Sequence, residues 1–483
     1  MAFAPTDEQT TALDLFGTGE NLVIEAGAGT GKTSTLKLLA NSTPQKGVYL
    51  AFNKAIVVEA QAKMPDTVTS RTAHSLAFGE TDPRFKARLG GGRMRSDEIA
   101  KMLGVKAIDL DLPSGKKRLA PGYLGGMVNR AITVFCQTAD LKPGARHMPF
   151  IEGIDIPSPD GKRTYYYNNL VATHLEPAIA KAWADITSFG GALPFKHEHY
   201  LKMWQLSAPK INADYIMFDE AQDANPVMRA IVDAQDHAQR IYVGDTNQQI
   251  YTFTGAVNAM AEVDGERTFL SQSFRFGPEI AASANVILGL LDAELRITGV
   301  GAPGVVEPCE SPDVILTRTN AEAVRNALRE LGRGGKPALV GGANEVVSFA
   351  KAADSLKEKN FTSHPELACF NSWMEVQEYV NHDPSGSELS LMVNLIDEFG
   401  TDVIIHSLDE CVTEAKASLV ISTAHKSKGR EWDKVRLAGD FPTGIDKNGE
   451  PTNVGDEELR LLYVAGTRAC LHLDTAGNPL FEA

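Results

Sequence analysis

The stretch NLVIEAGAGTGKTSTLKLLAN, residues 21–41, decides the fold of this chain. It opens with the apolar run NLVIEA (21–26), typical of a buried strand, and closes with the helical stretch KTSTLKLLAN (32–41). A glycine-rich turn joins them. Such a turn between a strand and a helix is the setting of a phosphate-binding loop, because N–H groups at a helix N-terminus attract anions. The stretch therefore predicts an α/β domain with an anion site at this turn.

The turn AGAGTGKT (26–33) follows the phosphate-loop pattern except that alanine stands at its first glycine position. Its glycines let the backbone curl around an anion, Lys32 would reach the β- and γ-phosphates, and the Thr33 hydroxyl would ligate Mg²⁺. A chance glycine-rich turn is the alternative, and the flanking strand and helix argue against it. The residues that we assign to nucleotide binding here are Ala26, Gly27, Ala28, Gly29, Thr30, Gly31, Lys32, Thr33 and Ser34.

Strand-like and helical segments alternate around this loop. The strand-like VYLAF (48–52) precedes the helical NKAIVVEAQAK (53–63), and the pattern resumes at 213–223, 241–245 and 267–273. Alternation of this kind predicts a parallel sheet with right-handed crossovers. A second α/β unit begins near 276 and includes DVILTRTN (313–320) and ASLVISTAH (417–425), among other strand-like segments.

Paired carboxylates end one of these strands. In YIMFDEAQD, Asp219 and Glu220 stand at the carboxyl end of the strand, where open α/β sheets bind ligands. Asp219 can hold Mg²⁺ through its water shell, and Glu220 can act as general base toward an attacking water. Adjacent carboxylates alone are weak support, but together with the loop they indicate nucleoside triphosphate hydrolysis.

Two insertions interrupt the alternation. We expect one α/β domain from residues 1–78 and 205–275, and a second from 276–345 and 416–483. The intervening 79–204 and 346–415 are expected to form inserted subdomains, the second one mostly helical. In the first insertion, IDIPSPDGKRTYYY predicts a β-hairpin at its PDG turn, and His197 and His199 are interpreted as surface histidines rather than metal ligands.

Composition narrows the class of protein. With 47 basic and 62 acidic residues the net charge is −15, which disfavours a protein that simply coats nucleic acid. Residues 84–118 nevertheless hold ten Lys/Arg against four Asp/Glu, which favours either a DNA contact or a solvated face. Five scattered cysteines, no apolar run of 18 residues and no visible secretory signal lead us to expect a cytoplasmic protein without a membrane span.

Seven motifs in order resemble the superfamily 1 DNA helicases of the Rep/UvrD type. They are PTDEQTTAL, VYLAFNKAI with TSRTAHSLA, DEAQD, VGDTNQQIYTFTGA, LSQSFRFGPEI, ISTAHKSKGREWDKV and LRLLYVAGTRA, and AGAGTGKT is the phosphate loop that accompanies them. In detail, these motifs are most similar to those of the F-box DNA helicase branch. We expect only the motor domains to be shared with that branch, because no F-box fits ahead of residue 9. The resemblance implies two RecA-like domains with ATP in the cleft between them. Thr254 stands where the family often has arginine, and the second insertion is short for the family.

The resemblance also implies roles for individual residues. Toward the nucleotide it implies that Gln9 reads adenine, Phe274 lies beneath it, and Glu431 lies near it. Gln248 would sense the γ-phosphate, and Arg275 and Arg468 would be arginine fingers in the second domain. The DNA contacts that it implies, with Phe253 stacking on a base, are Asn53, Lys54, His74, Tyr251, Phe253, His425 and Lys426.

The leading hypothesis is an ATP-dependent 3′→5′ DNA helicase or single-strand translocase, with the polarity taken from the resemblance. It would use ATP and Mg²⁺ and act on single-stranded DNA and single/double-strand junctions, with any protein partner unknown. An ATP-gated regulatory subunit that binds nucleic acid without unwinding is the alternative, and an RNA helicase is a third hypothesis. DNA repair and recombination suit the family, and phage replication and defence stay open.

Overall fold

The computed structural model divides the chain into two compact units. We call residues up to 76, 208–342 and 410 onward the sheet unit, and residues 77–207 and 343–409 the inserted unit. The structure describes residues 4–51, 54–92, 94–113, 115–155, 165–250, 260, 263–364, 366–368, 370–381, 388–446 and 448–482.

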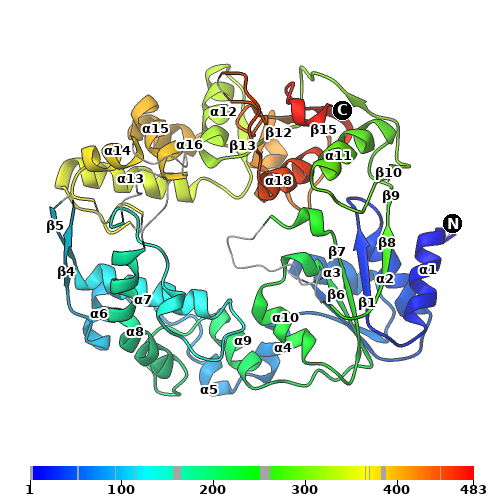
Figure 1. The fold of residues 1–483 in the computed structure, drawn as a ribbon, viewed down its shortest axis with the longest axis horizontal. Helices are drawn as coiled ribbons and strands as arrows, with labels where there is room; N and C mark the ends of the chain where they lie inside the picture. The colour runs from blue at the N-terminus through cyan, green and yellow to red at the C-terminus, as the bar shows by residue number, and fades with distance from the viewer. Residues whose placement is uncertain are drawn as a thin grey trace. The chain divides into compact units, whose positions relative to one another are not determined.

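The sheet unit contains two parallel sheets, each with six strands (Figure 1). The first has the strand order β3-β2-β6-β7-β1-β8. Its strands are β1 (Leu22–Ala26), β2 (Gly47–Ala51), β3 (Val68–Thr72), β6 (Tyr215–Asp219), β7 (Gln239–Gly244) and β8 (Glu266–Leu270). The inner strands β1, β2 and β6 are buried almost throughout, as in a sheet whose two faces are covered by helices, whereas the edge strands β3 and β8 expose every second residue or more.

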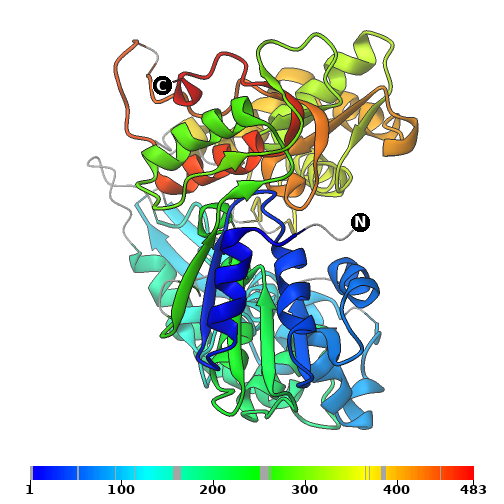
Figure 2. The same ribbon diagram turned by 90° about the vertical axis from the view of Figure 1, so that its right-hand side faces the viewer.

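Four helices accompany the first sheet: α1 (Asp7–Phe16), α2 (Lys32–Asn41), α3 (Lys54–Lys63) and α10 (Pro226–Asp233). The N-terminal helices are the blue ones beside this sheet in Figure 2. Phe16 of α1 and Leu36 and Leu39 of α2 pack with Ile24 of β1 in one core. A capping box between Thr6 and Gln9 starts α1.

The second sheet has the order β11-β16-β15-β12-β14-β13 and is likewise parallel. Its strands are β11 (Val305–Val306), β12 (Val314–Thr317), β13 (Pro337–Leu339), β14 (Leu419–Thr423), β15 (Trp432–Leu437) and β16 (Ala469–Asp474). The short β9 (Gln272–Ser273) and β10 (Thr298–Gly299) pair with each other. The helices are α11 (Pro278–Leu290), α12 (Asn320–Gly332), α17 (Ala424–Ser427) and α18 (Asp456–Gly466). The two sheets are RecA-like, and the α/β fold class expected from the sequence is confirmed.

The inserted unit is largely helical. The helix α4 (Ala73–Glu80) leads into it from the first sheet. Its first segment holds α5 (Pro83–Lys86), α6 (Ser96–Leu103), the antiparallel hairpin β4 (Ile108–Leu112) and β5 (Gly115–Leu119), α7 (Pro121–Phe135), α8 (Tyr166–Ile186) and α9 (His197–Leu206). Its second segment holds α13 (Asn344–Lys359), α14 (Trp373–Asn381), α15 (Glu388–Phe399) and α16 (Thr401–Asp409).

The two inserted segments, which the sequence led us to expect as separate subdomains, contact each other within one unit. The Tyr379 hydroxyl donates to the Glu152 carboxylate, and Lys117 Nζ lies 3.9 Å from Glu375 Oε1. The hairpin expected at the PDG turn falls on 156–164, outside the described residues. The described hairpin is instead β4–β5, whose antiparallel pairing runs from Ile108 with Leu119 to Leu112 with Gly115.

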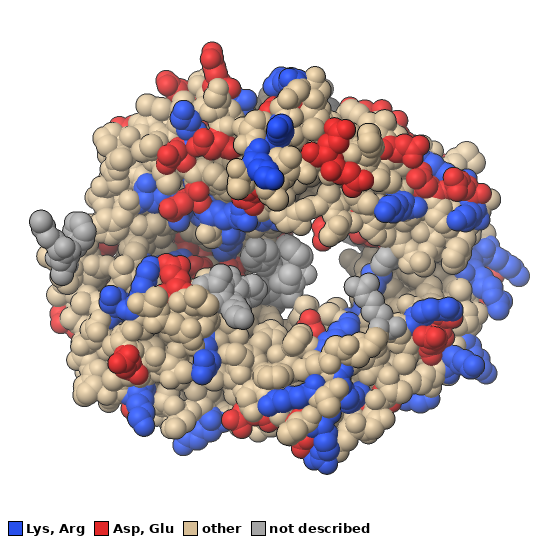
Figure 3. Space-filling view, turned by 180° about the vertical axis from the view of Figure 1, so that it is seen from behind, with Lys and Arg blue, Asp and Glu red and all other residues tan. Residues whose placement is uncertain are grey.

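The structure corrects two local expectations for the inserted unit. His199 is buried and not a surface residue: its Nδ1 accepts the Lys196 N–H at 3.0 Å, and burial lowers its pKa to about 3. The basic stretch 84–118 is partly neutralised, because Arg84, Arg95 and Arg118 pair with nearby aspartates. Figure 3 shows basic and acidic side chains interspersed over one face. Within the described ranges, no helix is long and apolar enough to cross a membrane.

Candidate nucleotide site

The phosphate loop joins β1 to α2 through glycines with left-handed backbone angles. Gly29 has φ 74° and Gly31 has φ 78°, a region that costs other residues energy. A Cβ on Gly29 would lie 2.6 Å from the Cβ of Arg275, so only glycine allows this approach. The Thr30 hydroxyl donates to the Gly27 carbonyl at 2.9 Å and stabilises the turn. The loop predicted from the sequence is therefore formed as a curled backbone at the start of α2.

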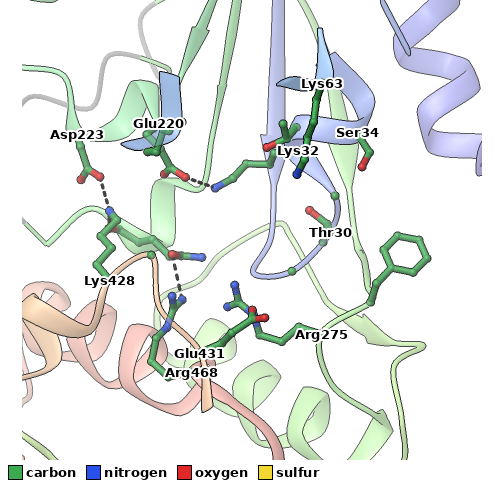
Figure 4. A pocket seen from close by; sticks show the side chains of 17 residues that line it. Thr30, Lys32, Ser34, Lys63, Glu220, Asp223, Arg275, Lys428, Glu431 and Arg468 are labelled. Carbon is green, nitrogen blue, oxygen red and sulfur yellow. Dashed lines mark hydrogen bonds and ion pairs between the residues drawn. The ribbon is translucent and has the colours of Figure 1, made fainter. Parts of the chain in front are cut away.

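Lys32 and Glu220 meet at the centre of the site. Lys32 Nζ lies 3.0 Å from Glu220 Oε1, and Figure 4 shows the two side chains pointing toward each other. Burial lowers the pKa of Lys32, but the carboxylates of Glu220 and Asp219 outweigh it and raise the pKa. Burial raises the pKa of Glu220, but the ammonium of Lys32 outweighs it and lowers the pKa. Both groups are therefore charged at neutral pH.

Asp219 lies at the end of β6, beside Glu220, and is 4% exposed. The Tyr49 hydroxyl donates to its Oδ2, and the Glu220 N–H donates to its Oδ1 at 2.9 Å. Burial, followed by the charge of Glu220, raises the pKa of Asp219. These contacts hold the carboxylate in one orientation at the edge of the site.

Glu220 has an unusual backbone. Its φ of 52° lies in the left-handed region, which is rare for residues other than glycine and costs on the order of 1–3 kcal/mol. The Gln222 side chain compensates by donating to Glu220 Oε2 at 2.6 Å. Gln222 also accepts the Asp245 N–H at 3.2 Å, so it links the ends of β6 and β7. Such strain is characteristic of functional sites and fixes where the carboxylate points.

Two arginines approach the loop from the side of the second sheet. Arg275, which follows β9, donates to Glu431 Oε2 at 2.8 Å and to the Thr467 carbonyl at 2.9 Å. Arg468, which follows α18, is 1% exposed, and burial lowers its pKa to about 9. Its Nη2 lies 3.3 Å from Gln248 Oε1, a residue of the first sheet. Arg275 and Arg468 therefore reach the phosphate loop from the opposite side of the cleft.

Other residues of the site were not singled out from the sequence. Lys428 pairs with Asp223 and donates to the Gln248 carbonyl, which joins α17 to the loop after β6. Burial raises the pKa of Asp223 to about 6, although Lys428 opposes the shift. Both residues stand inside recognised motifs, DEAQD and STAHKSKGREWD. The sequence motifs contain both residues, but they do not show that the two pair across 205 positions, because that contact depends on the fold.

The cleft encloses a pocket of about 530 Å³, a size that suits a nucleotide. Beside the phosphate loop, a Cβ added to Gly31 would lie 3.8 Å from both Gln9 Nε2 and Phe274 Cε2, the two residues expected to contact adenine. Phe274 is 53% exposed, and Gln9 donates to Thr35 Oγ1 at 3.1 Å. The predicted residues that line the pocket are Gly29, Thr30, Gly31, Lys32, Thr33, Ser34, Glu220, Gln248, Phe274, Arg275, Glu431 and Arg468.

The oxygen donors beside Lys32 fit a magnesium ion. Thr33, which carries a hydroxyl, lines the pocket, and the buried Asp219 carboxylate lies at the end of β6. Magnesium prefers oxygen ligands and keeps several waters, so one hydroxyl and a carboxylate acting through water suffice with the phosphates.

The residues predicted to contact DNA are only partly described. His74 lies half-buried on α4, and Lys426 on α17 lies 3.4 Å from Asn320 Oδ1. Burial lowers the pKa of His425, which hydrogen-bonds the Ile250 backbone. Asn53, Tyr251, Phe253 and the Lys54 side chain lie outside the described residues, as does Thr254. Of the described residues in this group, His74, His425 and Lys426 do not line the nucleotide pocket.

The described fold and site define an ATP-binding protein with a phosphate loop and two RecA-like domains. Residues 9–254 match the AAA domain family, and residues 342–473 match the UvrD-like helicase C-terminal domain. The chain belongs to the superfamily 1 helicases of the UvrD type.

Several curated proteins are similar. F-box DNA helicase protein 1 of Schizosaccharomyces pombe is 30% identical over 93% of this chain and 55% of its own length. F-box DNA helicase 1 of Gallus gallus is 29% identical over 93% of this chain and 47% of its own. ATP-dependent DNA helicase UvrD2 of Mycobacterium tuberculosis is 25% identical over 53% of this chain and 46% of its own. The chain thus spans about half the length of these relatives.

Proposed function

We propose that this chain is an ATP-dependent DNA helicase that moves 3′→5′ along single-stranded DNA and unwinds duplex ahead of it. The observation that carries the proposal is the pocket in which Lys32 and Glu220 face Arg275 and Arg468 from the two sheets. The relatives named as DNA helicases support DNA as the substrate, and the polarity rests on resemblance to the family.

The ion pair between Lys32 and Glu220 supplies the first step of the mechanism. A bound triphosphate offers Lys32 several negative oxygens, so the ammonium turns from the carboxylate to the phosphates. Glu220 then loses the partner that lowers its pKa and becomes a stronger base toward water. Binding of the nucleotide itself therefore prepares the general base.

Arg275 and Arg468 complete the site because guanidinium groups spread the charge of a transferring phosphoryl group. In other enzymes such arginines contribute about 10³–10⁵ in rate. Thr33 and Asp219 would hold magnesium, which supplies positive charge against the phosphates when it is bound. Arg468 follows α18 beside the second sheet, and Arg275 is bonded to Glu431 and Thr467 on the same side. The attraction of both arginines to the phosphates therefore favours a closed cleft, and hydrolysis releases it.

The coupling of this cycle to DNA runs through the segment after β7. Gln248 contacts Arg468 and lies three residues before Tyr251, and His425 hydrogen-bonds Ile250 beside it. We propose that Tyr251, Phe253, His74, His425 and Lys426, with Asn53 and Lys54, hold the single strand. If Gln248 shifts when the γ-phosphate is bound or released, Tyr251 and Phe253, which follow it in the chain, would shift with it and move the bound strand.

Strand displacement on paired substrates tests the proposal. Duplexes of equal length with either a 3′ or a 5′ single-stranded tail are offered with ATP and Mg²⁺, with Lys32→Ala as the inactive control. Unwinding of the 3′-tailed duplex alone is expected. Unwinding from the 5′ tail would reverse the polarity. Tight, nucleotide-dependent DNA binding with no unwinding or translocation would favour the regulatory subunit instead.

A further inference from the structure

The strand that leads into the phosphate loop carries a carboxyl group that takes no part in the proposed hydrolysis. β1 reads LVIEA, and Glu25 is its only charged residue, between the buried Ile24 and Ala26. A carboxyl group in such apolar surroundings costs free energy unless hydrogen bonds satisfy it. Its hydrogen-bond partners are therefore the first indication of its role.

Both oxygens of the Glu25 carboxyl group bind one residue, Thr246. Oε1 accepts the Thr246 backbone N–H at 2.6 Å, and Oε2 accepts the Thr246 hydroxyl at 2.7 Å. The two residues meet because β1 and β7 pair in parallel, with Glu25 opposite Gly244, and Thr246 follows two residues later. One carboxyl group thus holds both the main chain and the side chain of Thr246, and we call this pair the Glu25–Thr246 clamp.

The clamp holds the first residue of the turn that carries Gln248. Thr246–Gln248 is a single turn of 3₁₀ helix, a conformation whose own hydrogen bonds have poor geometry. Asp245 supports the turn from the same segment, since it accepts the Asn247 N–H at 3.0 Å and the Gln248 side-chain amide at 2.7 Å. Glu25 supports it from a different strand, so the turn is fixed to β1.

The same strand also anchors the phosphate loop. β1 ends at Ala26, and the loop leads from there to Lys32 at the start of α2. Lys32 and Gln248 both line the nucleotide pocket. Because the clamp joins the turn that carries Gln248 to the strand that carries the loop, it constrains where Gln248 lies relative to phosphates bound by Lys32.

We propose that Glu25 is a positioning residue for recognition of the γ-phosphate. Through Thr246 it holds Gln248 where this side chain meets the γ-phosphate of ATP, and the site thereby distinguishes ATP from ADP. ADP has no γ-phosphate, so its binding depends on the loop and not on the clamp. Gln248 is itself proposed to sense that phosphate, so the role of Glu25 rests on the proposed function.

Nucleotide binding to the full chain tests the clamp. Calorimetric titration in the presence of Mg²⁺ measures the affinity for ADP and for the non-hydrolysable β,γ-imido analogue of ATP. Glu25→Leu removes both acceptors and should weaken binding of the analogue about fivefold or more, and Thr246→Val removes one donor and should weaken it about threefold or more. Binding of ADP should change by less than about twofold, because both variants leave the loop itself intact.

Conservative variants separate positioning from folding. Glu25→Gln keeps an oxygen that accepts the Thr246 N–H, and Thr246→Ser keeps the hydroxyl, so both should bind the analogue nearly as the wild type does. Thr317→Val, in β12 of the second sheet, removes a buried hydroxyl that is bonded to the Thr319 carbonyl. It is the matched control for the loss of a buried hydroxyl and should leave both affinities unchanged.

Gln248→Ala separates the role of Glu25 from that of Gln248. We expect this variant to weaken binding of the analogue but not of ADP. A loss in Gln248→Ala with no loss in Glu25→Leu or Thr246→Val would overturn the clamp and leave the sensor in place. Unchanged affinities in Gln248→Ala would refute the sensor and the clamp together. Equal losses for both nucleotides in Glu25→Leu and Thr246→Val would also overturn the proposal, since the γ-phosphate would then make no difference.

Discussion

The Tyr463 hydroxyl donates a hydrogen bond of 2.9 Å to Asp245 Oδ2 and accepts one of 3.2 Å from the Ala28 N–H. Tyr463 belongs to α18 beside the second sheet, whereas Asp245 and Ala28 follow β7 and β1 of the first. All three residues are buried. One hydroxyl therefore connects the phosphate loop, the segment leading to Gln248 and the helix that precedes Arg468.

Replacing Tyr463 with Phe should destabilise the sheet unit, because the buried Asp245 carboxylate and Ala28 N–H both lose a partner. A loss of about 1–3 kcal/mol is expected from urea unfolding. The ATPase should also respond less to DNA, since the link between the sheets is broken. Tyr242→Phe removes a hydroxyl bonded to Asp233 at 2.6 Å, away from the loop, and should leave DNA stimulation intact. Equal losses of stimulation in the two variants would contradict the linking role.

Lys32→Ala should abolish ATP turnover and leave much of the DNA binding, because the phosphates and the strand use different residues. Steady-state ATPase and fluorescence anisotropy with single-stranded DNA measure the two properties. Lys37→Ala changes an exposed lysine on the same helix and should behave as wild type. Turnover near the wild-type rate in Lys32→Ala would refute the assignment of the loop.

Glu220→Gln should still bind ATP but lower kcat about 10²–10⁴-fold, because an amide cannot take a proton from water. Nucleotide affinity and single-turnover hydrolysis separate the two effects. The control Glu266→Gln alters an exposed carboxyl at the start of β8. An unchanged kcat in a folded Glu220→Gln protein would exclude Glu220 as the base.

The buried carboxyl of Glu25 should make the stability of the protein depend on pH. Burial, and then Asp245, raises the pKa of its carboxyl to about 7 from the usual 4.5. The folded state therefore binds this proton more tightly than the unfolded state, and stability falls as pH rises from about 4.5 to 7. In wild type, the free energy of unfolding should fall by on the order of 2 kcal/mol across this window, and Glu25→Gln should remove that fall. Glu20→Gln, at an exposed position, should not remove it. Parallel stability curves for wild type and Glu25→Gln from pH 4.5 to 8 would show that the carboxyl does not titrate there.

Phe253 stays a prediction from the sequence, since it lies outside the described residues. A base stacked on an aromatic ring is worth about 1–3 kcal/mol, so Phe253→Ala should weaken strand binding roughly five- to a hundredfold. DNA-stimulated ATPase and unwinding should fall together while the basal ATPase survives. Phe269→Ala, which removes a partly exposed ring on β8, serves as the control. Normal unwinding by Phe253→Ala, or its failure to fold, would exclude stacking.

Much of the nucleotide site could be predicted because its signals are local. A strand, a glycine-rich turn and a helix within 21 residues specify the loop, and DEAQD at the end of a strand specifies the carboxylates. The roles of Gln9, Phe274, Arg275 and Arg468 came from ordered motifs, and all but Gln9 line the pocket, with Gln9 beside Gly31. The β4–β5 hairpin was not predicted, because its second strand, GKKRL, is mostly charged, whereas strands are recognised by their apolar, β-branched and aromatic residues.

The sequence by itself determined the strand, turn and helix that form the loop and predicted which residues carry phosphate chemistry, because loop geometry and strand ends depend on neighbours along the chain. Only the tertiary structure decided how they are held. Lys428 meets Asp223, and Tyr463 meets Ala28 and Asp245, across separations of about two to four hundred residues. Ion pairs and hydrogen bonds need atoms within about 3 Å, and that proximity arises only when the two sheets pack together.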